Sequence, residues 1–288
     1  MSFKKIFAVS LLLFVVLLLS ASGFAYYQWE NLPDVNILNT CFIANMNQVE
    51  VCPKKQNYTR LKEISQNLIE AIIVSEDGAF WAHNGIDWFE IKQSLRDNFS
   101  TGRLKRGGST ITQQLVKNIF FSPEKTLSRK IKEAILAHRV EQQFSKKTIL
   151  EKYMNVVEFG PNIYGIRAAA HHYFSKSPSE LSVLESAFLA FLLPNPKGYY
   201  TYFEKGELSP FAQKMILLIC KRLYFYHKIP ESEYRLAVAN VDRFPWYGFM
   251  EQENLSEDDF NINELNEDQL NEEFEKIIDE AVPQDLNN

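Results

Sequence analysis

Cysteine is scarce in this chain of 288 residues, and the three that occur, Cys41, Cys52 and Cys220, form no cluster. A structural zinc site takes its Cys and His ligands at short, regular spacing, so the sequence indicates no such site. Cys41 and Cys52 have two equally open interpretations: a disulfide that closes a short loop in an oxidising compartment, or two unrelated thiols. A chain of this length buries a substantial core without cross-links.

Alternation of apolar and polar residues with a period of two is nearly absent as well. Such alternation marks half-buried strands, whereas apolar residues here recur at three- and four-residue spacing, as they do on one face of a helix. We therefore predict a mainly α fold with one main domain and appendages. Helices are expected over residues 127–143, 147–157, 164–174, 180–193, 209–227 and 230–240.

Basic residues are almost missing from the end of the chain. Residues 251–288 hold fourteen Asp or Glu and one Lys, a net charge of −13, and the total of −5 then leaves +8 on residues 1–250. A basic body indicates an anionic partner, but no nucleic-acid-binding module of aromatic and basic residues stands out. We expect phosphate on a small or lipid-linked ligand, or an anionic membrane surface, and no nucleic acid. The acidic tail is predicted to be flexible; the alternative is one amphipathic helix through Leu270, Phe274, Ile277, Ile278 and Ala281.

A long hydrophobic run occurs near the start, from Ile6 to Tyr27, and it contains no charged residue. About 20 such residues span a bilayer, and the preceding Lys4 and Lys5 are expected to stay on the cytoplasmic side. We predict that residues 1–29 form an uncleaved anchor and residues 30–57 a linker to an exported domain. A cleaved signal peptide is the alternative, because the residues at positions 21–23, towards the end of the run, are small.

Two adjacent carboxylates, Glu76 and Asp77, follow an apolar helical pattern that begins near Leu61. Loss of solvent raises the pKa of a carboxyl group on a hydrophobic surface, which suits Glu76 to general-base work. The plainer interpretation is a solvated helix end.

A glycine pair at 107–108 precedes a helical pattern with apolar residues at 111, 115 and 119. Ser109 is predicted to cap this helix, whose N-terminus would bind an anion. Donors spaced to share one face follow the cap: Gln114, Lys117 and Asn118. An ordinary capped surface helix is the alternative.

A second carboxylate, Glu133, lies one helical turn beyond Arg129 and close to Lys130. This spacing predicts a cationic patch beside an acid, and the alternative is an exposed ion pair of little energetic value.

These stretches, together with Lys147-x-Ile-Leu-Glu-x-Tyr-Met-Asn155, resemble the peptidoglycan glycosyltransferases of glycosyltransferase family 51. The family includes the monofunctional biosynthetic peptidoglycan transglycosylases and one half of the class A penicillin-binding proteins. The motifs occur in order across residues 58–200. The resemblance implies a lysozyme-like, mostly helical glycosyltransferase core over residues 58–205, with a smaller membrane-proximal lobe. Residues 206–250 are then the last helices of the same domain.

By this resemblance the protein polymerises lipid II onto a growing glycan chain, inverts the anomeric centre and releases undecaprenyl pyrophosphate. Glu76 matches the family's catalytic base and Glu133 its second glutamate. Lys117, Arg129 and Lys130 match the phosphate-contacting positions. The donor cleft is expected to include Ser109, Thr110, Gln114 and Asn118, and Phe80 is expected to touch substrate or membrane.

The resemblance further implies a single-pass protein of the bacterial inner membrane, with its catalytic domain on the periplasmic side. Its partners would be lipid II, the glycan chain, the membrane and proteins of cell-wall synthesis or division. It implies no specific cofactor, and a divalent cation, magnesium or manganese, near Glu133 is left open. His83 is predicted to order its loop, and Glu151 and Tyr153 to be scaffold.

Two other functions compete with polymerisation. The paired carboxylates also suit a lysozyme-like glycan hydrolase, and the anchor with its acidic tail suits a non-catalytic scaffold of a cell-wall synthesis complex. A bifunctional penicillin-binding protein is disfavoured, because the Ser-x-x-Lys pattern at 122–125 lies inside the glycosyltransferase segment and no Lys-Thr-Gly follows.

Overall fold

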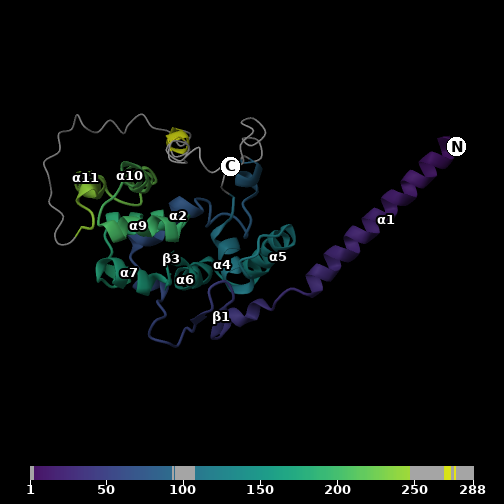
Figure 1. Cartoon of the computed structure of the whole chain (residues 1–288), viewed down its shortest axis with the longest axis horizontal. Coiled ribbons are helices and arrows are strands. Elements are labelled where there is room, and N and C mark those ends of the chain that lie inside the picture. Colours follow the sequence, from purple (N-terminus) through teal and green to yellow (C-terminus); the bar gives the residue numbers. More distant parts are fainter. Residues whose placement is uncertain (1–2, 93, 95–107, 247–268, 274–275, 277–288) are drawn as a thin grey trace.

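The computed structural model describes residues 3–92, 94, 108–246, 269–273 and 276. Helix α1 (Phe3–Glu30) extends away from a helical body (Figure 1). Among the described residues it is the one helix long and apolar enough to cross a membrane, and none of that apolar stretch is buried in the protein. Length and composition therefore agree with the predicted anchor, although a signal sequence would satisfy the same criteria.

The prediction of a mainly α fold is confirmed. The 3₁₀ helices are η1 (Val35–Asn39), η2 (Leu61–Glu63), η3 (Pro178–Glu180) and η4 (Val241–Arg243). The α-helices of the body are α2 (Gln66–Glu76), α4 (Ile111–Phe120), α5 (Leu127–Gln143), α6 (Lys146–Val156), α7 (Ile166–Phe174), α8 (Val183–Leu192), α9 (Pro196–Lys205), α10 (Pro210–Phe225) and α11 (Glu231–Asn240).

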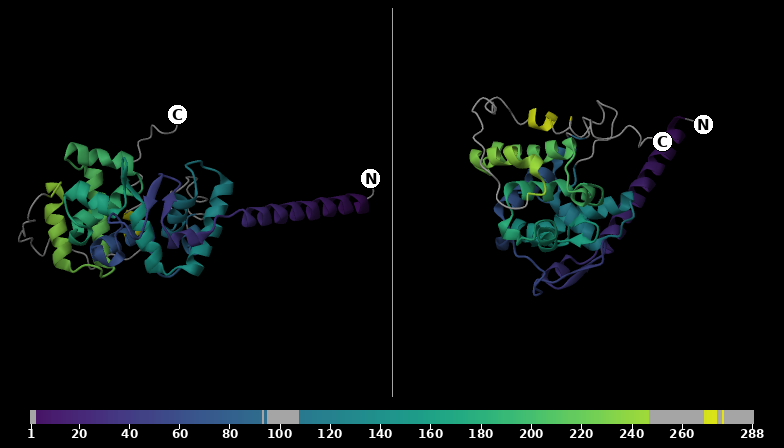
Figure 2. Two further views of the ribbon diagram at one scale, coloured as in Figure 1. Left: turned by 90° about the horizontal axis from the view of Figure 1, so that it is seen from below. Right: turned by 60° about the vertical axis from the view of Figure 1, so that its left-hand side comes forward.

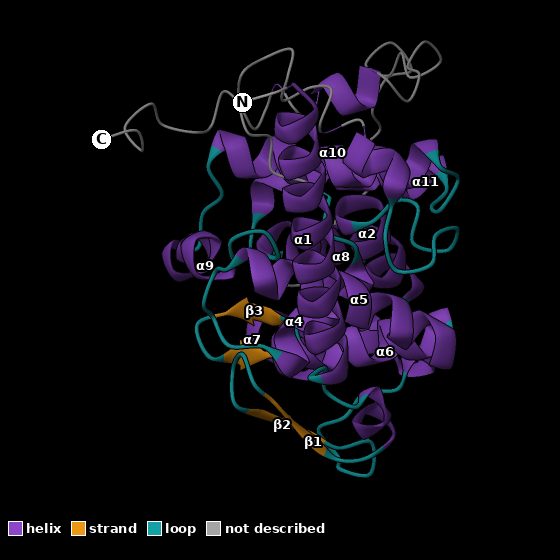
Figure 3. Ribbon diagram, turned by 90° about the vertical axis from the view of Figure 1, so that its right-hand side faces the viewer, coloured by secondary structure: helices purple, strands orange, loops and turns teal. Residues whose placement is uncertain are grey.

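Strands occur in two small antiparallel sheets, β1 (Phe42–Ala44) with β2 (Val49–Val51) and β3 (Glu158–Gly160) with β4 (Ile163–Tyr164). Figure 3 shows the β1–β2 hairpin at the lower edge of the helical body and β3 beside α7, and Figure 2 gives two further views of the chain. A disulfide joins Cys41 to Cys52 across the β1–β2 hairpin, which resolves the two interpretations left open by the sequence. Next to it, the backbone N–H groups of Asn45 and Met46 donate to the last turn of α4, at 2.9 and 3.0 Å.

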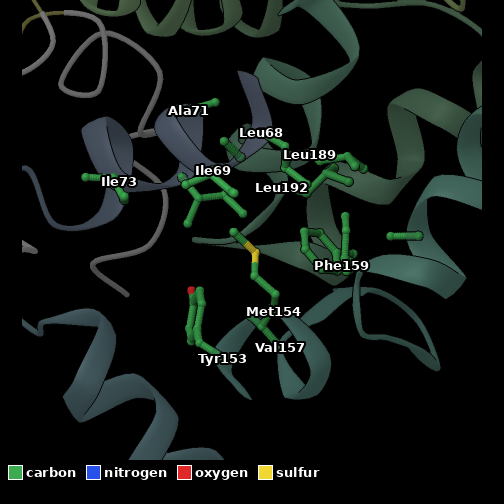
Figure 4. Packing of buried hydrophobic residues seen from close by; sticks show 14 of the residues in the cluster. Leu68, Ile69, Ala71, Ile73, Tyr153, Met154, Val157, Phe159, Leu189 and Leu192 are labelled. Atoms are coloured by element: carbon green, nitrogen blue, oxygen red, sulfur yellow. The ribbon is translucent and has the colours of Figure 1, made fainter. Parts of the chain in front are cut away.

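Helix α8 lies at the centre of the body, and all ten of its residues are buried. It packs against α2 and α10, while α4 packs against α5 and α6. Figure 4 shows how α6 connects the two groups, because Met154 points towards Ile69 of α2. Burial of an aliphatic side chain of this kind contributes about 1.5–3 kcal/mol. The end of α2 that carries Glu76 is thus fixed by a continuous core.

Helix α9 was not predicted, because the two prolines at 194 and 196 suggest a break in the chain. Pro196 instead occupies the first turn, where the missing N–H costs nothing. The Asn195 side chain accepts from the N–H of Gly198 and caps the helix at 3.2 Å. The prolines therefore end α8 and begin a new helix.

Residues 269–273 of the acidic tail are helical, and Leu270 is only 1% exposed within the core. This described part of the tail is attached to the body, whereas most of the tail predicted to be flexible lies outside the described residues. The aromatic residues that follow Glu76 and Asp77 differ in exposure. Phe80 is fully buried, while Trp81, Trp88 and Phe89 are exposed by 46%, 70% and 74%.

Candidate active site

Glu76 is the last residue of α2, and its carboxylate meets α4. The Nε2 atom of Gln114 donates to Glu76 Oε2 at 2.7 Å, and the hydroxyl of Tyr153, on α6, donates to Gln114 Oε1 at 3.1 Å. Among the described residues no hydrogen bond reaches Glu76 Oε1. Glu76, Gln114 and Tyr153, which come from three separate sequence motifs, therefore meet at one carboxylate.

The surroundings raise the pKa of Glu76 above its ordinary value, chiefly because burial disfavours the charged carboxylate. The hydrogen bond from Gln114 and the charge of Lys117 act in the opposite direction, whereas neighbouring Asp77 adds to the increase. A carboxylate with this balance binds a proton more readily than a solvated one, as a general base requires. The interpretation of Glu76 as part of a solvated helix end does not fit.

Asp77 holds the site together rather than facing a ligand. Its Oδ2 accepts from the N–H of Ile111 at 2.8 Å, at the start of α4, and its Oδ1 lies 2.8 Å from Nε2 of His83. Because His83 Nδ1 accepts from the N–H of Gly85, Nε2 carries the proton and donates it to Asp77. This arrangement gives His83 the loop-ordering position expected of it, and it ties the end of α2 to the start of α4.

Glu133 lies on α5 with 2% of its surface exposed, so it is not part of an exposed surface pair. Its Oε1 is 2.9 Å from Arg129 Nε, and its Oε2 is 3.2 Å from Lys130 Nζ. Lys130 also donates to Ser109 Oγ at 2.8 Å. Buried charges persist when they are paired in this way. The cluster presents two cations, one of them half exposed, next to the start of α4.

The ammonium group of Lys117 interacts electrostatically with both Glu76 and Glu133. Burial lowers its pKa most, the charges of Lys130 and Arg129 lower it further, and Glu133 and Glu76 raise it. Lys117 therefore lies within the fields of both carboxylates. Glu76 and Glu133, 57 positions apart in the sequence, belong to one electrostatic region.

The remaining predicted residues have mixed outcomes. The cap of α4 is Thr110 and not Ser109: the Thr110 hydroxyl accepts from the N–H of Gln113 and donates to the carbonyl of Gly85. Its hydroxyl is thus used within the protein. Asn118 is on α4 but 8% exposed. Arg106 and Gly107 lie outside the described residues.

Phe80 is placed differently from the expectation that it touches substrate or membrane. Its ring is 0% exposed and lies beneath Lys146, whose Nζ is 4.4 Å from the ring centre. Trp81 packs edge-on against it with ring centres 5.1 Å apart. Removing the apolar ring of Phe80 from water stabilises the fold, which explains why it packs in the core.

Sequence reasoning assigned Tyr153 to the scaffold and gave Asp77 no separate role, although both contact the site. The adjacency of Glu76 and Asp77 was a usable signal, since an Asp side chain readily accepts from the free N–H groups at a helix N-terminus, as Asp77 does from Ile111. Tyr153 gave no such signal. Its phenol is buried, which keeps its pKa well above the ordinary value and its proton in place.

A divalent cation beside Glu133 would have to displace a cation that is already there, because Arg129 and Lys130 face its two oxygens. In the part of the chain that the structure describes, no group of three or more His, Cys, Asp or Glu side chains is arranged for a metal.

The transglycosylase family model matches residues 44–219. The chain is 46% identical over 147 residues to the biosynthetic peptidoglycan transglycosylase of Acinetobacter baylyi. This aligned segment covers 51% of this chain and 66% of that protein. It is 37% identical over 219 residues to penicillin-binding protein 1A of Aquifex aeolicus, covering 73% of this chain and 30% of that protein. The matches thus span somewhat less than two thirds of the first relative and under a third of the second. Because the family model covers more than half of the chain, including Glu76, Gln114 and Glu133, this chain belongs to the transglycosylase family.

Proposed function

We propose that this protein is a membrane-anchored peptidoglycan glycosyltransferase that polymerises lipid II into glycan strands and releases undecaprenyl pyrophosphate. The observation that carries the proposal is the position of Lys117 within the fields of both Glu76 and Glu133. A proton-accepting carboxylate and a cationic cluster then serve one reaction. The relatives, a biosynthetic peptidoglycan transglycosylase and a penicillin-binding protein 1A, support the same reaction class.

The acceptor is lipid II, and a hydroxyl of its sugar attacks the anomeric carbon of the growing glycan. As the new C–O bond forms, the hydroxyl proton passes to Glu76, whose Oε1 is the oxygen left for it. The bond from the anomeric carbon to the pyrophosphate breaks at the same time. Attack from the side opposite the leaving group inverts the anomeric centre, as in inverting glycosidases, with a sugar hydroxyl in place of water.

The leaving pyrophosphate takes both electrons of the broken bond and needs charge neutralisation more than a proton. Lys117, Arg129 and Lys130 supply positive charge on the side of Glu133. Lys130 is the most accessible of these, with 47% of its side chain exposed, and Ser109 holds it at the start of α4. Glu133 keeps the cations together so that their mutual repulsion does not spread them apart.

The anchor places this reaction at a membrane surface. The end of α1 is attached to α5, because Gln28 Nε2 donates to Ser128 Oγ at 3.3 Å and the guanidinium of Arg139 lies 3.8 Å from the ring centre of Trp29. Helix α5 also carries Glu133, so anchor and cationic cluster share one rigid element. The exposed Trp81, Trp88 and Phe89 replace Phe80 as the candidates for a membrane-proximal lobe. The proposed site is the bacterial inner membrane, with the body on the periplasmic side.

Two incubations test the proposal against its rivals. Purified full-length protein in detergent is given lipid II in one and finished glycan strands in the other. Consumption of lipid II with release of undecaprenyl pyrophosphate is expected, and the finished strands should stay intact. Hydrolysis of the strands would instead support the lysozyme-like alternative. Inertness towards both would support the non-catalytic scaffold, which the acidic tail and cell-wall or division partners motivate.

A further inference from the structure

The helical turn of residues 269–273 packs on α10. This turn lies outside residues 44–219, which match the family model. Figure 1 draws it in yellow near α10. Leu270 is buried in the core, and Glu273 Oε2 lies 2.7 Å from Lys221 Nζ. Asn271 Oδ1 accepts a hydrogen bond of 2.9 Å from Nη2 of Arg222. An apolar contact, an ion pair and a hydrogen bond therefore attach this turn to one helix.

Arg222 extends the contact to the base-bearing helix. Its guanidinium is buried, and Nη1 donates to the backbone carbonyl of Val74 at 3.3 Å. The last four carbonyls of a helix have no partner within the helix, and α2 ends at Glu76. The carbonyl of Val74 is one of these, so Arg222 supplies the missing donor. A cation at a helix C-terminus also interacts favourably with the helix dipole.

The guanidinium suits this double role because its N–H groups lie in a rigid plane and reach two acceptors at once. Val74 is two residues before Glu76, and Asn271 fixes the other side of the same group. Without the turn, one donor of a buried guanidinium loses its acceptor, and the hold on the end of α2 loosens. A displacement of about 1 Å in a catalytic group can cost on the order of 100-fold in rate.

We propose that residues 269–273 form an internal clasp that holds Arg222 against the last turn of α2 and thereby positions Glu76. Arg222 acts here through the backbone of α2 and is a positioning residue. The clasp bears on turnover only if the proposed function holds. Its effect on the end of α2 is independent of that function and can be measured without substrate.

The first measurement is hydrogen exchange of the backbone amides at 75–77 in the full-length protein. Asn271→Leu removes the acceptor for Arg222, and exchange at these amides is expected to rise about tenfold. Asn271→Asp keeps an acceptor in the same place and should preserve the wild-type rate. Glu272→Gln is the matched control, because Glu272 is exposed on the same turn, and it should also exchange like the wild type.

The second measurement is lipid II polymerisation by the same variants. Asn271→Leu is expected to lower kcat several-fold and to leave KM near its wild-type value, because the substrate-contacting cations are untouched. Asn271→Asp should restore kcat. Leu270→Asp, which detaches the turn by another route, should reproduce the effect of Asn271→Leu on both measurements.

Two results would overturn the clasp. One is wild-type exchange at 75–77 in both Asn271→Leu and Leu270→Asp. The other is an equal rise over the whole domain, which would make the turn a general stabiliser. If the wild-type protein does not polymerise lipid II, the proposed function fails, and the exchange data still decide the clasp.

Discussion

The side-chain amide of Gln114 donates a 2.7 Å hydrogen bond to Oε2 of Glu76, although the two residues are 38 positions apart. This bond opposes the burial that raises the pKa of the carboxylate. Burial makes Glu76 a stronger proton acceptor, and the hydrogen bond from Gln114 and the charge of Lys117 limit that increase in pKa. The proton affinity of the candidate base is therefore set mainly by burial, by the hydrogen bond from Gln114 and by the charge of Lys117.

Replacing Glu76 with Gln is expected to lower turnover by about 10²–10⁴-fold, because the base is lost while the side-chain volume is kept. The measurement is lipid II polymerisation, with Glu204→Gln on the exposed face of α9 as the matched control. A variant that keeps a tenth of the wild-type rate would show that another group takes the proton.

The same substitution has a pH-dependent effect on stability. The folded-state pKa of Glu76 lies above its unfolded value, so ionisation destabilises the fold as pH rises through that interval. Glu76→Gln is neutral throughout, and its melting temperature should exceed that of the wild type above this interval. Below the ordinary pKa of glutamate the difference should vanish. A difference that does not change with pH would contradict the raised pKa.

Gln114→Leu removes the donor to Glu76, and the pKa of the carboxylate should rise further. Because the base works when deprotonated, the acid limb of the pH–rate profile should move to higher pH. The measurement is kcat against pH for polymerisation. A fall in rate with an unmoved acid limb would assign Gln114 to substrate binding alone.

Tyr153→Phe removes the hydroxyl that orients the amide of Gln114. The freed amide no longer presents its N–H₂ group to Glu76 all the time, so the acid limb should shift in the same direction as in Gln114→Leu, by less. The half-buried side-chain carbonyl of Gln114 also loses a partner, which costs about 1–2 kcal/mol of unfolding free energy. In the double variant the pH shift should equal that of Gln114→Leu alone; additive shifts would refute the connection.

Glu133→Gln removes the negative charge that pairs with Arg129 and Lys130. We expect a loss of turnover nearly as large as for Glu76→Gln, because Arg129 and Lys130 lose their common partner. Stability should fall by about 1–3 kcal/mol. The acid limb should stay close to its wild-type position, which distinguishes this role from that of the base. A limb that moves as far as in Gln114→Leu would contradict the separation of roles.

Reduction of the Cys41–Cys52 disulfide should lower the free energy of unfolding by about 2–3 kcal/mol, the loop-entropy value for a closure of this length. The hairpin it closes donates to the end of α4, the helix of Lys117. Denaturant unfolding of the oxidised protein, compared with Cys41→Ser/Cys52→Ser, measures the effect. Buried Cys220 is the control, because Cys220→Ala should not change the response to a reductant. Equal stability of the oxidised protein and the double variant would refute the prediction.

Helix positions were predictable from sequence because apolar spacing is a local property. The segment 127–143 is helical as predicted, and α10 and α11 lie within two residues of their predicted limits. The N-cap of α4 was predicted at Ser109, one residue before its actual position at Thr110. Ser109 and Thr110 are both good capping residues, and only the extended backbone at Thr110, φ −67° and ψ 161°, decides between them.

The sequence by itself determined the helical class, the long apolar helix near the start, the order of the motifs and the two glutamates, since each depends on residue type and spacing. Only the tertiary structure decided that Phe80 is core and Trp88 is surface, that Tyr153 reaches the site, and that Leu270 brings the acidic end back to the body. The physical reason is that burial and proton affinity depend on contacts between residues tens of positions apart, as with Gln114 and Tyr153 at Glu76. Local pattern carries no record of such contacts.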